Sequence, residues 1–244
     1  MTIFFIQEKN EMNIALVGHG KMGRMIENMA AAYDIRVTAV FDIDTPLRES
    51  DTVREMVAET DVLVDFSVPM AAADNIRTAA ALKKNMVIGT TGWSSQLSEI
   101  EKTITASGTA LVYGSNFSLG VNLFYKIIEY TGKILSAAGT YDPYLVESHH
   151  KQKKDSPSGT ALNLAALLKD SMQEREIPVS SIRAGYIPGI HEIGFDSRAD
   201  TIRLIHSARS REGFADGALQ AARWISGKTG IHTFSDVLDD LFFT

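Results

Sequence analysis

The sequence has 244 residues, a formal net charge of −6 at pH 7 and no cysteine. That length suits one large domain or two modest ones, and the acidic balance excludes a general nucleic-acid binder. The lack of cysteine excludes a disulfide framework, a thiolate nucleophile and a cysteine-based zinc site. Every apolar run is too short to span a membrane, so we expect no membrane partner and a cytoplasmic location. Residues 1–11 read as an extension with no assigned role.

The first half of the chain alternates short apolar strands with helices. Strands are predicted at residues 13–17, 36–41, 62–66, 86–88 and 110–113, and helices at 22–33, 51–59, from about Pro69, and at 94–107. Strands and helices in this alternation are typical of a parallel, doubly wound sheet with right-handed crossovers. We therefore predict an α/β, Rossmann-like domain.

The pattern changes in the second half. A helix at 119–135 leads to a strand at 141–148 and a helix at 158–169, and strand-like segments follow at 181–186, 189–195 and 201–206 before a helix at 214–226. Strands that follow one another without intervening helices indicate a mixed or antiparallel sheet. We predict a second, α+β domain here.

A glycine-rich turn lies between the first strand and the first helix. Gly18, Gly20 and Gly23 have the G-x-G-x-x-G spacing, which allows a tight turn and lets a pyrophosphate approach the helix N-terminus. Asp42 ends the second strand, where a carboxylate can bond ribose hydroxyls. This order predicts a dinucleotide-binding domain.

The sequence indicates the cofactor site more clearly than the choice between NADH and NADPH. The Asp42 carboxylate repels a 2′-phosphate, and Ile43 offers no positive charge to hold one, so NADH is favoured. Lys21 and Arg24 lie in or beside the turn and can meet a 2′-phosphate, which keeps NADPH as the alternative.

The segment from Glu147 to Ala161 gathers positive charge in an acidic chain. It holds two adjacent histidines and three lysines, and then Ser158-Gly159-Thr160 opens a helix. Lysines beside a helix N-terminus form a good receptor for a substrate with two carboxylates. A flexible basic loop and a metal site are the competing interpretations. Adjacent histidines on a strand point to opposite faces and no cysteine is near, so no metal is assigned.

The same run, E-x-H-H-x-x-K-x-D-x-P-S-G-T-A, resembles the signature of 4-hydroxy-tetrahydrodipicolinate reductases. Further stretches agree with the family along nearly the whole chain, from Val17 to about Val237: Gly89-Thr-Thr-Gly92, Ser115-Asn-Phe-Ser118, Gly120-Val-Asn122 and Arg211-x-x-Phe214-Ala-x-Gly217. The resemblance implies a nicotinamide-dependent reductase of a cyclic dicarboxylate, on the route to diaminopimelate and lysine.

The resemblance also implies roles for individual residues and a domain plan. The catalytic pair would be His149 and Lys153, and the substrate would be bound by His150, Lys153, Ser158, Gly159 and Thr160. Cofactor contacts would come from Gly18, Gly20, Lys21, Met22, Gly23, Asp42, Gly89, Thr90, Thr91, Gly114, Ser115, Asn116, Phe117, Arg211 and Phe214. The domains would be residues 12–117, completed by 212–244, and residues 118–211, assembled as a homotetramer.

The sequence departs from the family pattern at two places. The phosphate turn is one residue shorter than the common G-x-x-G-x-M-G form, and Ile43 stands where many members have arginine, which weakens the expectation of dual cofactor use. The alternatives are another two-domain oxidoreductase, such as an aspartate-dehydrogenase-like enzyme, and a dinucleotide-sensing regulator, which would not need the cationic segment. His191, His206 and His232 lack motif context and are interpreted as structural or surface residues.

Overall fold

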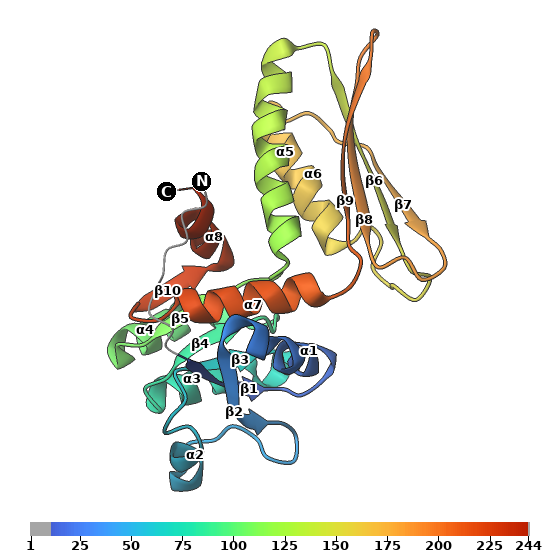
Figure 1. Ribbon diagram of the computed structural model, residues 1–244. Helices are drawn as coiled ribbons and strands as arrows, with labels where there is room; N and C mark the ends of the chain where they lie inside the picture. Colours follow the sequence, from blue (N-terminus) through green and yellow to red (C-terminus); the bar gives the residue numbers. More distant parts are fainter. Residues whose placement is uncertain (1–10, 244) are drawn as a thin grey trace, which may run out of the picture. The chain divides into compact units, whose positions relative to one another are not determined.

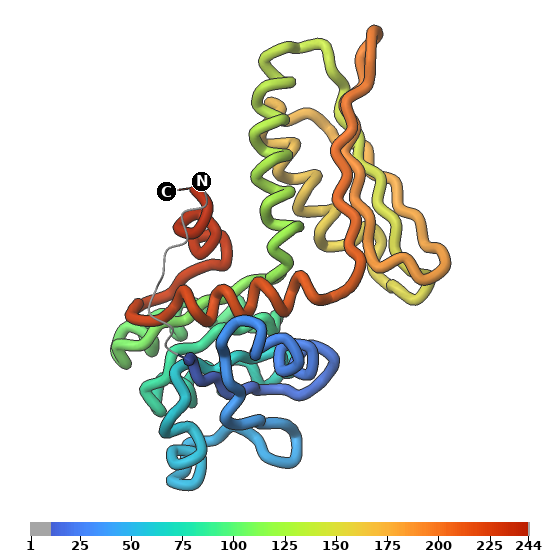
Figure 2. Tube along the Cα trace, in the orientation of Figure 1, coloured from blue at the N-terminus to red at the C-terminus, as the bar shows by residue number. Residues whose placement is uncertain are grey.

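The computed structural model describes residues 11–243, so the predicted extension, except Glu11, lies outside the described part. Among the described residues, no helix combines the length and the apolar character that crossing a membrane requires. The chain divides into two compact units, unit 1 (Met1–Ser118 and Phe214–Thr244) and unit 2 (Leu119–Gly213). Figure 2 shows the trace leaving the strands of unit 1 for the elements of unit 2 and returning through the orange-red helix.

Unit 1 contains a parallel sheet of six strands, in the order β10-β5-β4-β3-β1-β2 (Figure 1). Its strands are β1 (Met12–Val17), β2 (Ile35–Phe41), β3 (Val62–Asp65), β4 (Asn85–Ile88), β5 (Ala110–Tyr113) and β10 (Gly230–Thr233). Its helices are α1 (Lys21–Ala30), α2 (Asp51–Met56), α3 (Pro69–Ala81), α4 (Leu97–Ser107), α7 (Glu212–Trp224, which starts at the end of unit 2) and α8 (Phe234–Phe242).

The central strands of unit 1 are buried on both faces. Leu63 and Met86 belong to an apolar cluster with side chains of α3 and α4, such as Ile76 and Ile100. The alternate strand residues point to the other face and are buried as well, as Val64 shows. A sheet buried on both faces needs helices on both, which is the doubly wound arrangement.

Unit 2 packs two helices on one face of a four-stranded sheet. The helices are α5 (Leu119–Ala138) and α6 (Gly159–Ser171), and the strands are β6 (Asp142–His149), β7 (Val179–Arg183), β8 (Ile190–Asp196) and β9 (Thr201–Ser207), in the order β7-β6-β8-β9. The inward residues of β6 and β8, Leu145, Ile193 and Phe195, form its core with helix residues such as Ile128 and Leu164.

The structure confirms the predicted fold class and adds three details. The sheet of unit 2 is mixed, because β7 runs parallel to β6 whereas β8 and β9 are antiparallel. The sequence pattern predicted no strand at β10 and no helix at α8. Both lie beyond the predicted helix at 214–226, and β10 is only four residues long, too short for a periodic signal.

Candidate functional site

The glycine turn of unit 1 adopts a conformation that only glycine fits. Gly18 has φ of 90°, and a Cβ there would lie 2.6 Å from the Cα atom of Ser67. A Cβ on Gly23 would lie 2.1 Å from the carbonyl oxygen of Gly18. Gly20, by contrast, faces open space and caps α1 without a side-chain hydrogen bond. The first N–H groups of α1 therefore remain available to an anion, and the turn fits a pyrophosphate.

Asp42 directly follows β2, at the carboxyl end of the strand beside β1. Its Oδ1 atom accepts a hydrogen bond from the backbone N–H of Ile43 at 2.9 Å, and the Ile43 side chain is 89% exposed. Arg24 does not reach toward Asp42. Its Nε donates to the carbonyl oxygen of His19, within the glycine turn, at 3.0 Å. The carboxylate therefore has no cation at the next residue.

Asp65, which the sequence analysis missed, ends β3 and is fully buried. Its carboxylate accepts hydrogen bonds from Ser67 (N and Oγ, 2.8 Å each), Thr90 (Oγ1, 2.8 Å) and Asn75 (Nδ2, 2.7 Å). These bonds tie the turn after β3 to the predicted cofactor loop after β4. An acidic residue closing the apolar run Val62–Val64 was the signal available in the sequence.

The other predicted cofactor residues differ in their setting. The Gly18–Gly23 turn, Asp42, Gly89–Thr91 and Gly114–Asn116 follow β1, β2, β4 and β5, so they gather at one edge of the parallel sheet. Three predicted cofactor residues have a different setting: Phe117, Phe214 and Arg211. Phe117 is buried against Phe66 and Phe234, with ring centroids 5.9 Å and 4.6 Å away, Phe214 is half-buried in α7, and the exposed Arg211 belongs to unit 2.

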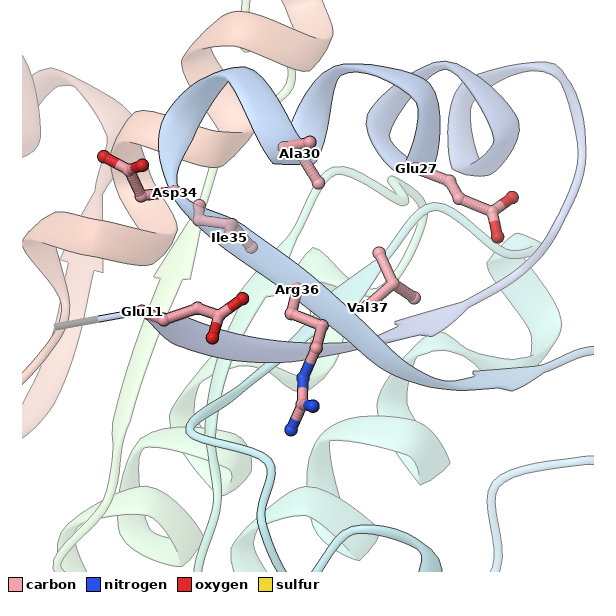
Figure 3. Close-up of a pocket in the computed structure, with 8 residues that line it drawn as sticks. Glu11, Glu27, Ala30, Asp34, Ile35, Arg36 and Val37 are labelled. Atoms are coloured by element: carbon pink, nitrogen blue, oxygen red, sulfur yellow. The ribbon is translucent and has the colours of Figure 1, made fainter.

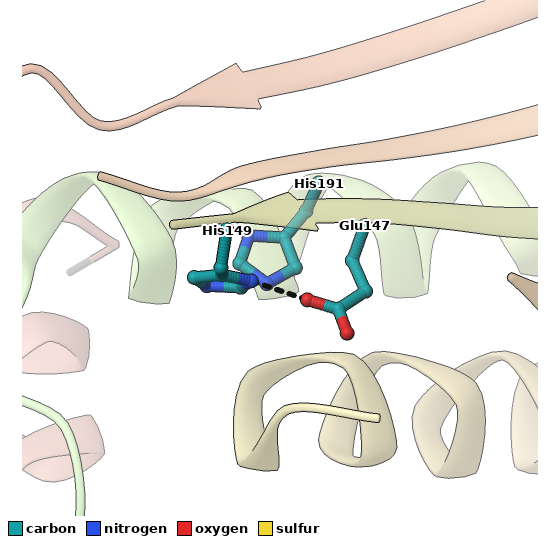
Figure 4. A group of neighbouring side chains, drawn as sticks. All are labelled: Glu147, His149 and His191. Carbon is teal, nitrogen blue, oxygen red and sulfur yellow. Dashed lines mark ion pairs between the residues drawn. The ribbon is translucent and has the colours of Figure 1, made fainter. Parts of the chain in front are cut away.

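Unit 2 brings three buried polar side chains together: Glu147, His149 and His191 (Figure 4). Glu147 and His149 lie two residues apart on β6 and so share a face, and His191 lies opposite Glu147 on β8. Nδ1 of His149 lies in direct contact with Oε2 of Glu147. The rings of His149 and His191 meet edge to face, with centroids 5.2 Å apart.

Glu147 has no exposed surface, and its second oxygen is also occupied. Oε1 accepts from a guanidinium nitrogen of Arg183 at 2.6 Å and from the backbone N–H of Ser158 at 3.2 Å. Burial raises the pKa of the Glu147 carboxyl, but hydrogen bonds from Arg183 and Ser181 and the charge of His149 bring it down to about 2. Glu147 is therefore a carboxylate at neutral pH.

The pKa values of the two histidines in this cluster are lowered as well, and here burial is the main cause. Burial lowers the pKa of His149 below its ordinary value, although Glu147 opposes the shift. Burial, and then the charge of His149, lower the pKa of His191 to about 4. Both imidazoles are therefore neutral at neutral pH. His191, which lacks a sequence motif and was interpreted as structural, belongs to the cluster. Arg183, which no sequence pattern singled out, also contacts it.

The predicted carboxylate-binding turn lies where α6 begins. Ser158 is buried, and its Oγ accepts from the N–H of Ala161 at 3.2 Å and lies 3.3 Å from Nε2 of His191. Gly159 is exposed, with open space where a Cβ would stand. At this helix start the Gly159 N–H bonds the Asp155 carboxylate, so the position suits an anion, whereas the Ser158 hydroxyl and the Ala161 N–H bond each other.

The predicted lysine and the second histidine lie on the loop between β6 and α6. Lys153 forms an ion pair with Asp155 at 2.8 Å, and its side chain is 25% exposed. His150 is half-buried, and its backbone N–H bonds the carbonyl oxygen of Ile187. Unit 2 therefore brings His149, Lys153 and the start of α6 to one end of its sheet.

A metal ion is the other occupant that this cluster suggests. Glu147, His149 and His191 offer three ligand atoms within 4.8 Å of one another. However, Arg183 and the Ser158 N–H already hold one carboxylate oxygen, and His149 holds the other. The Arg183 guanidinium, 2.6 Å from Oε1 of Glu147, also repels a cation. The arrangement fits a carboxylate–imidazole pair with Arg183 as the counter-ion better than a metal centre.

A cavity of about 460 Å³ in unit 1 does not coincide with these residues (Figure 3). It is lined by Glu11, Glu27, Ala30, Ala31, Asp34, Ile35, Arg36 and Val37. The strand residues among them belong to the first half of the edge strand β2, away from the end marked by Asp42. Its three carboxylates repel an anionic ligand, so it is not the expected cofactor site.

Comparison with known proteins agrees with this arrangement. The family model "Dihydrodipicolinate reductase, N-terminus" matches residues 12–117, and "Dihydrodipicolinate reductase, C-terminus" matches residues 120–238. The 4-hydroxy-tetrahydrodipicolinate reductase of Christiangramia forsetii is 40% identical over 95% of this chain and 99% of its own. That of Methanocaldococcus jannaschii is 34% identical over 93% and 97%.

Solved structures show the same fold. A dipicolinate-bound dihydrodipicolinate reductase from Paenisporosarcina sp. TG-14 superposes with a TM-score of 0.77, covering 94% of this chain and all of that one at 21% identity. Together, the two family models span both units and nearly all of the described residues. The chain therefore belongs to the dihydrodipicolinate reductase family.

Proposed function

We propose that this chain, an NAD(P)H-dependent oxidoreductase of its family, reduces 4-hydroxy-tetrahydrodipicolinate to tetrahydrodipicolinate in the cytoplasm, on the route to diaminopimelate and lysine. The observation that carries the proposal is the Glu147–His149 pair beside the start of α6 and Lys153. It combines a protonatable ring with donors for carboxylates, which a cyclic dicarboxylate requires.

Unit 1 would hold the cofactor at the carboxyl edge of its sheet. The Gly18–Gly23 turn and the N-terminus of α1 suit the pyrophosphate, and the Asp42 carboxylate suits the ribose hydroxyls. When bound, the nicotinamide supplies the hydride. We favour NADH over NADPH, because Asp42 repels a 2′-phosphate and Ile43 provides no cation to offset it.

Unit 2 would hold the substrate by its carboxylates. The N–H groups at Gly159 and Thr160 suit one carboxylate, and His150 and Lys153 add positive charge or hydrogen bonds for the second. Loss of water from the 4-hydroxy ring conjugates C4 with the C=N bond. Reduction at C4 then moves an electron pair toward nitrogen, and a proton completes the reaction.

The proton would come from His149 or Lys153. His149 is neutral in the free protein because its burial lowers its pKa. A doubly negative substrate nearby raises that pKa again, since opposite charge favours the imidazolium. The ring can therefore take up a proton when the substrate binds and release it during the reduction.

A homotetramer is the proposed assembly, and the outer face of the unit 2 sheet supports it. The face opposite α5 and α6 carries Tyr144, Val146, Ile182, Ile190 and Ile205, of which Ile182 is 48% and Ile205 55% exposed. Apolar side chains in such a group mark an interaction surface. Light scattering should give the mass of four chains, and Ile205→Lys should lower it.

The function is tested by reduced-nicotinamide consumption with enzymatically generated 4-hydroxy-tetrahydrodipicolinate. We expect turnover with NADH, slower turnover with NADPH, and no NAD reduction with aspartate. His149→Gln should lower kcat about 10²-fold or more, the usual contribution of a general acid. His232→Gln in unit 1 is the matched control and should leave the rate unchanged. Lack of turnover with either cofactor would refute the assignment.

A further inference from the structure

We infer that Glu147 is a positioning residue for the proposed reaction: it orients His149 and fixes its tautomer, and it holds the start of α6 in place. The inference rests on the proposed function for its kinetic consequence. The inference also predicts which ring nitrogen of His149 carries the proton, and this part can be tested without any substrate.

The geometry gives Glu147 a separate contact for each task. Oε2 meets Nδ1 of His149, and Oε1 meets both Arg183 and the N–H of Ser158. One buried carboxylate therefore connects the end of β6, the end of β7 and the first residue before α6. Bulk solvent does not reach these contacts, because Glu147 has no exposed surface.

The charges determine which nitrogen of His149 carries its proton. A carboxylate only accepts hydrogen bonds, so the neutral imidazole facing it must be protonated at Nδ1. Nε2 is then the atom with the free lone pair. A Cβ at Gly189 would lie 3.1 Å from Nε2, so the glycine leaves room on that side of the ring. Nε2 is therefore the nitrogen that can exchange a proton with a ligand.

Arg183 makes this arrangement possible. A buried carboxylate alone would take up a proton, and the guanidinium 2.6 Å away offsets its charge. Arg183 lies across from His149 on the neighbouring strand β7. It also bonds the carbonyl oxygen of Asp155 at 2.7 Å, so it fixes the loop that carries Lys153.

Glu147→Gln tests the inference, because the amide can fit in only one orientation. Arg183 and the Ser158 N–H both donate, so the amide oxygen must face them and the NH₂ group must face His149. That group donates to Nδ1 and forces the proton onto Nε2. We expect kcat to fall about 10²-fold or more, the scale of losing acid–base catalysis, while the alkaline limb of the rate profile, where the His149 imidazolium is lost, moves to lower pH. The limb moves because a negative charge beside His149 is gone.

The deciding readout is the nitrogen NMR spectrum of ¹⁵N-histidine-labelled protein without ligands. The wild type should show His149 protonated at Nδ1, and Glu147→Gln should show it protonated at Nε2. Glu147→Asp, which keeps the charge, should keep the wild-type tautomer. Glu129→Gln, on α5 and paired with Lys133 four residues later on the same helix, is the matched control and should change neither the spectrum nor the rate.

Two results would overturn the inference. One is an Nε2-protonated His149 in the wild type, and the other is an unchanged tautomer in Glu147→Gln. Should that variant fold poorly, the double variant Glu147→Gln/Arg183→Met removes the unpaired guanidinium, and Ser158 still orients the amide. Binding of one Zn²⁺ with loss of the Nδ1 proton would also refute it, since Glu147 would then be a ligand. Because the spectrum needs no substrate, an inactive protein with the expected tautomers would refute the proposed function alone.

Discussion

Among residues 11–243, each unit buries one carboxylate near the end of a strand, and the two are held differently. Asp65 in unit 1 and Glu147 in unit 2 both have no exposed surface. Asp65 receives its hydrogen bonds from a backbone N–H, two hydroxyls and an amide, all neutral. Glu147 is flanked by a guanidinium and an imidazole.

The kind of partner that holds each carboxylate matches the site that lies beside it. Neutral donors fix the shape of the loops after β3 and β4 without placing a second charge beside a site proposed for an anionic cofactor. The charge of Arg183 keeps Glu147 ionised, and the Glu147 carboxylate sets the protonation of His149, which the proposed reaction uses. The buried carboxylate thus stabilises loop conformation in unit 1 and supports proton transfer in unit 2.

The largest effect is expected from Arg183→Met. It leaves Glu147 buried without its cation, which should lower the free energy of unfolding by about 3–5 kcal/mol. Both tryptophans, Trp93 and Trp224, lie in unit 1, so the urea transition seen by circular dichroism should begin before the one seen by tryptophan fluorescence. Arg203→Met, an exposed arginine on β9, is the control and should cost under about 0.5 kcal/mol. Equal losses in the two variants would contradict the comparison.

The next effect is a dependence on pH in unit 2. His191 has a folded pKa of about 4 against an ordinary value of 6.5. A lowered histidine pKa contributes stability above pH 6.5 that is lost as the pH falls toward 4, because the unfolded chain binds the proton first. Between pH 7 and 5 the wild type should therefore lose about 2 kcal/mol more than His191→Asn in urea titrations. A parallel loss in both proteins would show that another group is responsible.

The smallest effect is expected from Thr90→Val. It removes one neutral donor and leaves Asp65 three hydrogen bonds, so the free energy of unfolding should fall by about 1.5 kcal/mol. Trp93 bonds the carbonyl oxygen of Thr90 and reports this change by fluorescence. Thr103→Val in α4, whose hydroxyl bonds only within its helix, should cost under about 0.5 kcal/mol. A loss as large as that of Arg183→Met would erase the distinction between the two carboxylates.

Local patterns made much of the molecule predictable. The Gly18–Gly23 turn, Asp42 and the start of α6 follow from neighbouring residues, and the doubly wound unit follows from alternation along the chain. The partners of His149 were not predictable in this way. Arg183 and His191 reach it only through the register of β7 and β8 on β6, which no local motif specifies.

The discontinuity of unit 1 has a consequence for synthesis on the ribosome. Unit 2 is complete once residue 213 has emerged, whereas β10 lies at residues 230–233. Until then the nascent sheet ends at β5, whose unpaired N–H and C=O groups can join strands of other chains. The interval during which this protein is most prone to aggregate therefore comes late in translation, after its second unit has already folded.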